Sequence, residues 1–399
     1  MTDYQRHPHA YTSAPKVAIK GDGSTVADPL PVPAPRTVRW DVPARFERGV
    51  APALLGERLA DPYRLDSQGP AGPSVRCHAC AHRCTIRDGR TGICGVRQNR
   101  GGELVSLVYG EVVAAHCEPI EKKPLFHVRP GSDAYSISTR GCNFHCRFCQ
   151  NWEIAQAPRE RLHPHATPMS PGEVVRDAVR LGARSIAYTY VEPTVFLEFA
   201  LDTAALAHEA GLLNVFVTNG YQTPEALRLM APLIDAANVD LKGFNDAFYR
   251  RVVGARLEHV LASLVEMRRL GMWVEVTTLV VPGGNDDPRE LRAAAAWIAR
   301  ELGADTPWHI SRYFPAYRMG DVLPTPVAAL VGTAQAGLDA GLHHVYVGNA
   351  RGLGGTDTSC GSCGRTLIRR LGYDVVERDL VDGACPGCRT PLAGIGIDG

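Results

Sequence analysis

The chain has 399 residues, with 43 Lys and Arg against 42 Asp and Glu. This length allows two or three domains, and the balanced charge excludes the basic footprint of a nucleic-acid or anionic-membrane binder. The sequence contains no run of eighteen apolar residues, and no apolar signal segment follows its start, MTDYQRHPHAY. We therefore predict a cytoplasmic protein without a membrane span, in which twelve cysteines indicate metal binding rather than disulfides.

The first 70 residues differ from the rest of the chain in their proline content. Alternating prolines at Pro29, Pro31, Pro33 and Pro35 favour an extended, solvated backbone. Little apolar periodicity accompanies them, so we expect residues 1–70 to form a flexible or surface-wrapping extension. A tail without a function of its own is the alternative interpretation.

Closely spaced cysteines mark the next segment, residues 71–130. The spacing C-x2-C-x3-C-x9-C is formed by Cys77, Cys80, Cys84 and Cys94. Four thiolates bind one zinc ion tetrahedrally, and they also hold a complete second [4Fe–4S] cluster, so the spacing leaves both options open. A second cluster would pass electrons to another centre, whereas zinc would only fold the loop. His82 is an alternative ligand, although a solvent-facing histidine is the favoured interpretation.

A second cysteine motif, C-x3-C-x2-C, lies in the segment 131–350 and is formed by Cys142, Cys146 and Cys149. Three thiolates can hold three irons of a [4Fe–4S] cube and leave the fourth iron free to bind a small molecule. Gly141 permits a tight turn before the motif, and Phe148 offers a flat face at the edge of a cluster. The alternative is a zinc site that borrows a cysteine from elsewhere.

Strand-like and helix-like stretches alternate between residues 134 and 347. The predicted strands are residues 135–138, 186–191, 213–218, 238–241, 273–281, 308–313 and 344–347. Helical periodicity places three apolar sets on common faces, namely Val174, Ala178 and Leu181; Leu257, Leu261 and Leu264; and Leu291, Ala295, Ile298 and Leu302. Ser170-Pro171-Gly172-Glu173 has the form of a capping box. These units predict an α/β fold whose parallel sheet, open or barrel-shaped, gathers ligands at the carboxyl ends of its strands.

Residues 351–399 carry two C-x2-C pairs, Cys360 with Cys363 and Cys385 with Cys388. Two such pairs with a short strand-like stretch between them predict a zinc-ribbon-like module. A module this small cannot build a large core, so zinc would supply much of its folding energy. Because no basic surplus accompanies the pairs, we expect a structural or partner-docking role rather than nucleic-acid binding.

The motifs together resemble a known family. C-x3-C-x2-C with an aromatic residue before the last cysteine resembles the radical S-adenosylmethionine (SAM) enzymes. The strings EPIEKKPLFH, PGS, GCNF and CQNW, between residues 118 and 152, resemble the radical enzyme of the AmmeMemoRadiSam system, a relative of pyruvate formate-lyase activating enzymes. The resemblance covers residues 77–394 and implies a partial (β/α)6 barrel. Glu118, where the family pattern leads us to expect aspartate, departs from it, as does the Pro-rich leader.

The resemblance also implies roles for polar residues that follow the predicted strands. SAM would bind the open iron through its amine and carboxylate. Glu192 would accept hydrogen bonds from the amine, in an element where Tyr190-Val191 replaces the family's two glycines; a carboxylate at a helix N-terminus is the alternative. Asn219 and Asp240 are expected partners of the ribose or the carboxylate. Lys242 would neutralise a carboxylate or the cluster, unless it is an ordinary solvated lysine.

Two further features lie between the cysteine motifs. Cys117 stands alone and is interpreted as a small core cysteine. The charged segment that distinguishes this family contains Glu121, Lys122, Lys123 and His127. It lines the substrate mouth in one interpretation and is a solvated charge run in the other.

The implied activity is radical chemistry. A low-potential donor of the flavodoxin or ferredoxin class reduces the cluster, and SAM is cleaved to methionine and a 5′-deoxyadenosyl radical that takes hydrogen from an unidentified substrate. A protein residue is one option, as in activating enzymes. Memo-like and AMMECR1-like proteins are implied partners. Two alternatives stay open: a binding or scaffold protein whose zinc or iron–sulfur sites are structural, and a radical SAM enzyme that modifies RNA or a small molecule.

Overall fold

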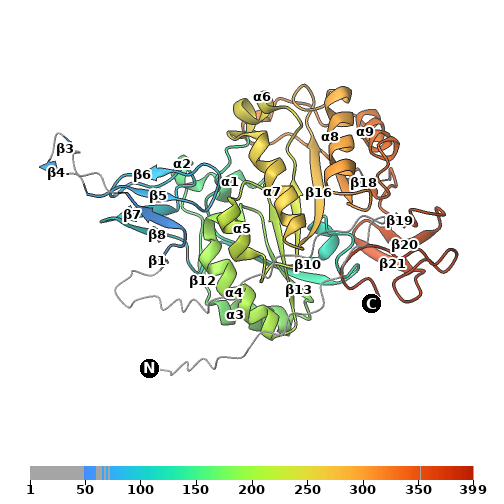
Figure 1. Cartoon of the computed structure of the whole chain (residues 1–399), viewed down its shortest axis with the longest axis horizontal. Helices are drawn as coiled ribbons and strands as arrows, with labels where there is room; N and C mark the ends of the chain where they lie inside the picture. Colours follow the sequence, from blue (N-terminus) through green and yellow to red (C-terminus); the bar gives the residue numbers. More distant parts are fainter. Residues whose placement is uncertain (1–48, 60–64, 67–68, 71, 351, 399) are drawn as a thin grey trace. The chain divides into compact units, whose positions relative to one another are not determined.

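The computed structural model describes residues 49–59, 65–66, 69–70, 72–350 and 352–398 (Figure 1). All of them belong to one compact unit, Thr37–Gly399. Most of the predicted extension over residues 1–70 lies outside the described residues. Its described part contains β1 (Ala51–Pro52) and β2 (Gly56–Arg58), which pair with β8 and β5 of the four-cysteine module. Main-chain pairing therefore places the start of this module before the predicted boundary.

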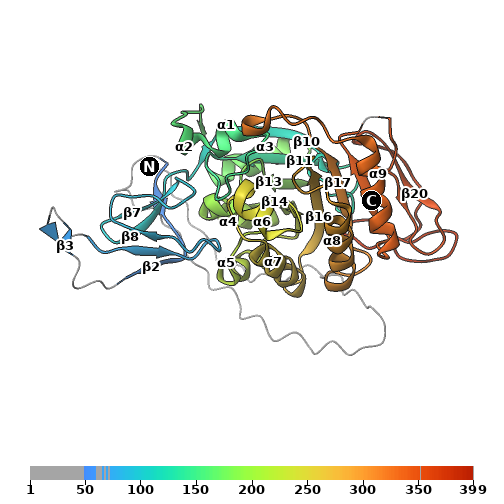
Figure 2. The ribbon, with the colours of Figure 1, turned by 90° about the horizontal axis from the view of Figure 1, so that it is seen from above.

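An 8-stranded sheet is the central element of the described chain, with the order β10-β11-β13-β14-β15-β16-β17-β18 (Figure 1, Figure 2). From β11 onward each neighbouring pair is parallel, and β10 is antiparallel to β11 at the edge. The strands are β10 (Ala114–Pro119), β11 (Asp133–Ser138), β13 (Ser185–Tyr188), β14 (Leu213–Thr218), β15 (Ala236–Asp240), β16 (Trp273–Val280), β17 (Trp308–Arg312) and β18 (Val345–Gly348). The predicted α/β fold with a parallel sheet is confirmed.

The strands start and stop where backbone conformation dictates. β14 has the predicted bounds, residues 213–218. The strand predicted over 186–191 instead ends at Tyr188, because Tyr190 adopts a left-handed φ of 64°, which turns the chain out of the sheet. Most inward and outward side chains of the parallel strands are buried, as expected where helices cover a parallel sheet.

Helices connect successive parallel strands and cover the sheet (Figure 2). They are α3 (Pro171–Arg180), α4 (Leu197–Glu209), α5 (Pro224–Met230), α7 (Leu257–Arg269), α8 (Pro288–Glu301) and α9 (Val327–Asp339). Shorter turns are η1 (Ile120–Lys122), α1 (Trp152–Ala155), α2 (Ala157–Glu160), η2 (Pro193–Phe196), α6 (Asp246–Phe248), η3 (Tyr249–Val253) and η4 (Tyr317–Met319). None of the helices in the described part of the chain has both the length and the apolar character needed to cross a bilayer.

The predicted helix signals are mostly confirmed. Ser170 and Glu173 form the capping box at the start of α3, where each side chain accepts from the backbone N–H of the other. The predicted face of α8 is buried over its whole length. Leu181 is a correction, because its side chain is 44% exposed. It lies just beyond the end of α3 at Arg180, where the helical period no longer directs it to the sheet.

Small antiparallel sheets form the segments before and after the main sheet (Figure 1). The small sheets of the N-terminal module contain β1, β2, β3 (Leu65–Asp66), β4 (Gly69–Pro70), β5 (Val75–Cys77), β6 (Thr85–Ile86), β7 (Arg97–Arg100) and β8 (Glu103–Ser106). A further two-stranded sheet pairs β9 (Glu111–Val112) with β12 (Thr167–Pro168). The C-terminal module contains β19 (Thr358–Ser359), β20 (Thr366–Leu371) and β21 (Asp374–Arg378). Each module has a small apolar cluster that includes two or more of its cysteines.

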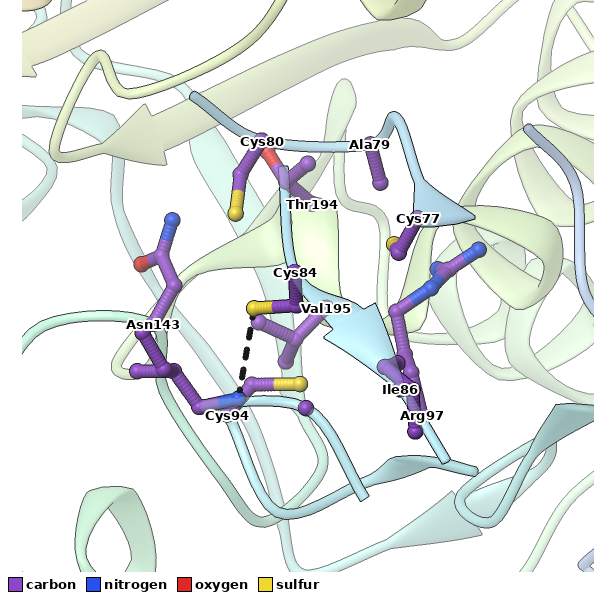
Figure 3. A pocket seen from close by; sticks show the side chains of 12 residues that line it. Cys77, Ala79, Cys80, Cys84, Ile86, Cys94, Arg97, Asn143, Thr194 and Val195 are labelled. Carbon is purple, nitrogen blue, oxygen red and sulfur yellow. Dashed lines mark hydrogen bonds between the residues drawn. The ribbon is translucent and has the colours of Figure 1, made fainter. Parts of the chain in front are cut away.

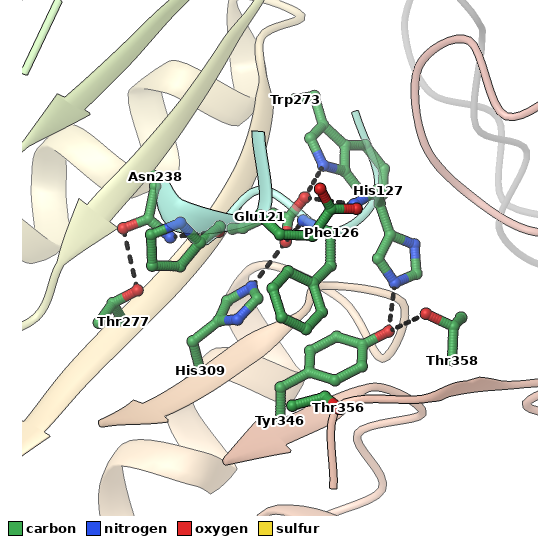
Figure 4. Close-up of polar contacts among 12 residues, drawn as sticks. Glu121, Phe126, His127, Asn238, Trp273, Thr277, His309, Tyr346, Thr356 and Thr358 are labelled. Carbon is green, nitrogen blue, oxygen red and sulfur yellow. Dashed lines mark hydrogen bonds and ion pairs between the residues drawn. The ribbon is translucent and has the colours of Figure 1, made fainter. Parts of the chain in front are cut away.

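The connection between β10 and β11 fills the amino end of the main sheet (Figure 4). The backbone N–H groups of Phe126 and His127 donate to the Glu275 carboxylate at 3.0 and 2.9 Å. The side chains of Trp273 and His309 contact the same carboxylate at 3.1 and 2.7 Å. Glu275 is the third residue of β16 and is fully buried. Its charge is tolerated there because both oxygens are hydrogen-bonded.

The C-terminal module extends this network through Arg370 of β20. Its guanidinium donates to the Phe126 carbonyl at 2.9 Å and to Thr358 Oγ1 at 2.8 Å, and it lies 3.4 Å from Glu121 Oε1. The guanidinium also stacks 4.3 Å from the centre of the Phe126 ring. His127 Nε2 contacts the Tyr346 hydroxyl at 2.7 Å (Figure 4). The amino end of the sheet is therefore closed by packed side chains.

This network corrects one of the two interpretations of the charged segment that follows β10. Glu121, Lys123 and His127 are buried, so the segment is no solvated charge run. Lys123 Nζ also lies 4.9 Å from the centre of the Tyr190 ring, and the Tyr190 carbonyl accepts from Asn151 Nδ2, just after the cysteine motif, so the interpretation as a substrate mouth stays a prediction. Lys123 Nζ pairs with Glu118 at 2.6 Å, and Glu121 accepts from the Gly131 N–H at 2.8 Å. Glu121 and His127 also have the distant partners Arg370 and Tyr346, which leave no local sequence pattern.

Two buried histidines make stability depend on pH. Burial lowers the pKa of His127 to about 3 and that of His344 to about 4, and a neighbouring histidine adds to each shift, His344 to that of His127 and His343 to that of His344. The unfolded chain binds these protons near pH 6.5 and the folded chain does not, so acidification below about 6.5 favours unfolding. Between pH 6.5 and its pKa in the folded protein, we expect each histidine to lower the free energy of unfolding by about 1.4 kcal/mol for each pH unit of acidification.

Urea unfolding at pH 7.5 and 5.5 measures this loss. The variant His344→Gln should lose less stability between the two values than the wild type, by about 1.4 kcal/mol. His343→Gln is the matched control, because that neighbouring side chain is 42% exposed. An equal acid loss in wild type and His344→Gln would show that His344 is not a neutral buried group.

Candidate active site

The loop after β11 carries the three cysteines of the C-x3-C-x2-C motif. Cys146 is buried, and Cys142 and Cys149 are half-buried. Gly141 precedes them with a φ of 90°. A Cβ atom at Gly141 would lie 2.9 Å from the Cys94 carbonyl oxygen and 2.6 Å from a methyl group of Val96. Only glycine fits this position, because both the conformation and the close approach exclude a side chain.

The three thiols are mutual neighbours in a desolvated setting. Burial raises the pKa of Cys142 to about 12 and raises the pKa values of Cys146 and Cys149 as well. The pKa values of Cys142 and Cys146 also rise because neighbouring thiolates of the motif repel them. In the described chain no three of these sulfurs lie within 4.8 Å of one another. This spread suits thiolates that bind different corners of a cluster, and binding would release their protons.

Asp240 and Lys242, at the carboxyl end of β15, form an ion pair beside these thiols. Lys242 Nζ lies 2.7 Å from Asp240 Oδ2. The ammonium lowers the pKa values of Cys146 and Cys149 and so opposes the effect of burial. Although burial disfavours the charged amine, Asp240 and the Cys146 thiolate raise the pKa of Lys242, which stays charged. Lys242 therefore places a positive charge, balanced by Asp240, next to the motif.

Glu192 is saturated with protein donors. Its carboxylate accepts hydrogen bonds from the hydroxyl groups of Thr194 and Thr218, the backbone N–H of Asn219 and the side chain of Gln222. It also caps η2 through the Thr194 N–H, which is the alternative role that the sequence allowed. Burial raises its pKa and these hydrogen bonds oppose the rise. With its oxygens occupied, Glu192 holds the ends of β13 and β14 together.

Asn219 and Phe148 are both engaged by neighbouring side chains. Asn219 Nδ2 donates to Asn143 Oδ1 at 2.7 Å, and its Oδ1 accepts from the Tyr221 N–H. This contact ties the end of β14 to the cysteine loop. The Phe148 ring stacks on Phe248 with centres 6.1 Å apart and shields the last turn of the motif. The structure thus brings the sequence-predicted residues of β13, β14 and β15 to the edge that carries the cysteine loop.

The four cysteines of the N-terminal module surround a cavity of about 20 Å³ (Figure 3). Burial raises the pKa of Cys94 to about 11 and raises that of Cys80 well above its usual value, with added repulsion from the other thiolates. Asn143 of the cysteine loop and Thr194 of η2 also line the cavity. His82 Nε2 contacts the Asn143 carbonyl at 2.9 Å, so this half-buried histidine links the module to the loop rather than facing solvent.

The C-terminal cysteines form a separate, tighter group. The sulfurs of Cys360, Cys363, Cys385 and Cys388 all lie within 4.8 Å of one another. Cys360 and Cys388 are 3.5 Å apart, and Cys363 and Cys385 are 3.6 Å apart. These values are close to the spacing of about 3.8 Å that tetrahedral thiolates take around one zinc ion. The group is arranged to hold a single metal ion. Cys117, by contrast, is half-buried on β10.

Sequence reasoning missed residues that connect these sites. Asn143 lies between two motif cysteines, and its position inside the motif was the only available signal. Gln156 donates to the Phe144 carbonyl at 3.0 Å and accepts from Arg159, which in turn donates to the Ile93 carbonyl. These contacts join the cysteine loop to the loop before Cys94 through residues of unremarkable type. No spacing rule identifies them.

Comparison with known proteins decides the family. A family model described as the Radical SAM superfamily matches residues 136–295, which include the cysteine loop and the strands around it. The uncharacterized protein MJ0808 of Methanocaldococcus jannaschii is 42% identical over 316 residues, which cover 79% of this chain and 93% of that protein. The chain belongs to the radical SAM superfamily. In this radical SAM protein the sulfurs of the three motif cysteines are not grouped as tightly as those of the C-terminal site. They fit the iron–sulfur cluster that the superfamily implies.

Two activating enzymes are also similar to this radical SAM protein. The isethionate sulfite-lyase activating enzyme of Nitratidesulfovibrio vulgaris is 26% identical over 201 residues, covering 48% of this chain and 62% of that enzyme. The benzylsuccinate synthase activating enzyme of Thauera aromatica is 24% identical over 143 residues, covering 34% of this chain and 43% of that enzyme. The chain spans less than two thirds of either enzyme.

Proposed function

We propose that this protein is a SAM-cleaving radical enzyme whose Cys142, Cys146 and Cys149 hold a [4Fe–4S] cluster with one open iron. These three are the only cysteines between residues 118 and 359, and they lie buried or half-buried in the loop after β11, at the carboxyl edge of the sheet. That observation carries the proposal, because three thiolates leave one corner for SAM. When bound, the reduced cluster supplies the electron that cleaves SAM into methionine and a 5′-deoxyadenosyl radical.

Residues of the chain bind SAM, orient it and shield the motif cysteines from water. Lys242, held by Asp240, offsets the negative charge of the thiolates and attracts the SAM carboxylate. Asn219 and Asp240 lie at neighbouring strand ends and are the proposed partners of the ribose. Glu192 is proposed to act as a positioning residue that fixes Asn219, since its oxygens are already engaged. The stacked ring of Phe148 keeps water from the last motif cysteine.

The substrate class is proposed from the relatives. Two of them are named as activating enzymes of other enzymes. We infer that hydrogen is taken from a residue of a protein substrate and that a flavodoxin- or ferredoxin-class protein donates the electron. The resemblance to the AmmeMemoRadiSam system makes Memo-like and AMMECR1-like proteins candidate partners. The same resemblance supports a partial (β/α)6 barrel for the sheet, and the ribbon spacing supports zinc at Cys360–Cys388. Twelve free cysteines suit the reducing cytoplasm.

Anaerobic reconstitution of the full chain tests this function. We expect a brown protein that forms 5′-deoxyadenosine from SAM under dithionite. Incubation with candidate proteins deuterated at glycine should transfer deuterium into 5′-deoxyadenosine only when the true substrate is present. A colourless protein that holds zinc alone and leaves SAM intact would instead support the scaffold alternative.

A further inference from the structure

The cavity of the N-terminal module differs from the ribbon site within the same molecule. In the ribbon, four sulfurs lie within 4.8 Å of one another; in the described chain, no three sulfurs of Cys77, Cys80, Cys84 and Cys94 do. All four nevertheless line one cavity (Figure 3). A single zinc ion draws its thiolates to one point, whereas a cube spreads them because each thiolate binds a different iron. The open arrangement matches a cluster, and the ribbon serves as the internal reference for a single ion.

Two buried N–H donors that line this cavity have no partner among the described residues. They are Nδ2 of Asn143 and Nε of Arg97, in side chains that are 1% and 2% exposed. A buried donor without an acceptor is costly. A [4Fe–4S] cube presents inorganic sulfides that accept hydrogen bonds, and such bonds are one of the means by which proteins set cluster potential. A zinc ion presents no such acceptor of its own.

We propose that Cys77, Cys80, Cys84 and Cys94 hold a second, fully ligated [4Fe–4S] cluster that delivers electrons to the centre at Cys142, Cys146 and Cys149. Four protein ligands leave this cluster no open iron, so it suits electron transfer rather than SAM binding. Its presence follows from the cavity alone. Its role as a relay rests on the proposed function of the three-cysteine centre.

The packing between the two loops supplies the route. The Cys94 carbonyl lies against Gly141, the residue before Cys142. Asn143 belongs to the three-cysteine loop, yet its side chain lines the four-cysteine cavity. The module is also docked beside the end of β14, where the Ala81 N–H donates to the Tyr221 carbonyl at 2.9 Å. One electron from a reduced flavodoxin- or ferredoxin-class donor reduces the second cluster, and the same electron then reduces the first, so no other reactant is needed.

Iron analysis tests the second cluster in the full chain. The wild type should contain about eight iron and eight sulfide per chain, and the triple variant Cys142→Ala, Cys146→Ala, Cys149→Ala should keep about four of each. The double variant Cys80→Ser, Cys94→Ser should also hold about four, with Cys117→Ser as a matched control at about eight. A triple variant that contains no iron, or a wild type with about four iron and two zinc ions, would overturn the proposal.

Rapid-freeze EPR of the wild-type protein tests the relay without a variant that must fold. After mixing with reduced flavodoxin, the signal that is insensitive to SAM should rise first, followed by the signal that shifts when SAM is added. A SAM-sensitive signal that rises first or simultaneously would overturn the relay. If no signal responds to SAM while the triple variant keeps its iron, the proposed function fails and the second cluster stands.

Discussion

The variant Cys146→Ala, reconstituted anaerobically, is expected to form no 5′-deoxyadenosine under dithionite. Cys146 is the middle cysteine of the motif and the most buried of the three, and it lies near Lys242. Two remaining thiolates cannot hold three corners of a cube, and water would enter the position of the lost ligand. Quantifying 5′-deoxyadenosine by mass spectrometry gives the answer directly.

Two controls separate lost chemistry from lost structure in that experiment. Cys117→Ala removes a half-buried cysteine on β10 that lies outside the three cysteine groups, and it should cleave SAM as the wild type does. Zinc content should stay at about one per chain in both variants, because the ribbon sulfurs form their own site. Turnover that is unchanged in Cys146→Ala would count against the three-thiolate centre.

Removal of the Glu198 carboxylate should free the N-terminal module from the main sheet. Arg97 of β7 and Glu198 of α4 are 2% and 4% exposed and form a two-pronged pair at 2.6 and 3.2 Å. Both groups also bond the backbone of Leu54. Because Glu198→Ala leaves the guanidinium charged and unpaired in a buried position, we expect a loss of about 3–5 kcal/mol in local stability. Hydrogen exchange at the backbone amides of β7 and β8 would measure this loss of local stability.

A second variant distinguishes the missing charge partner from lost packing. Arg97→Met with Glu198→Leu replaces both charges by apolar groups of similar size and should recover much of the protection, since buried pairs gain little over such replacements. Glu301→Ala breaks an exposed pair with Arg300 and should leave exchange almost unaltered. If the single Glu198 variant exchanges like the wild type, the pair does not anchor the module.

Local patterns predicted the elements of this fold well and their connections poorly. The alternation of strands and helices, the Ser170 capping box and the bounds of β14 were all readable, because each depends on neighbours within a few residues. The early end of β13 was not, since it depends on the left-handed conformation of Tyr190. β10, at the sheet edge, carries exposed and half-buried residues without strict alternation and was also missed.

The candidate site likewise combines features that local sequence predicted with features that depend on distant residues. Spacing alone identified all three cysteine groups, since metal ligands must be close in space and were close in sequence. It could not choose between zinc and a cluster for Cys77–Cys94, because that choice depends on how far apart the sulfurs lie once folded. Nor could it foresee that the oxygens of Glu192 would be taken by Thr218 and Asn219, 26 and 27 positions further along the chain.

The amino end of the sheet, which packed side chains close, limits how a substrate can enter and leave the site. Among the described residues, Glu275, Arg370 and the aromatic ring of Phe126 pack across that end. The protein substrate proposed above would therefore insert a loop or a terminus from the side that carries the cysteine loop and leave by the same path. Release of the modified protein and binding of the next one would then use the same opening, so we expect inhibition by product.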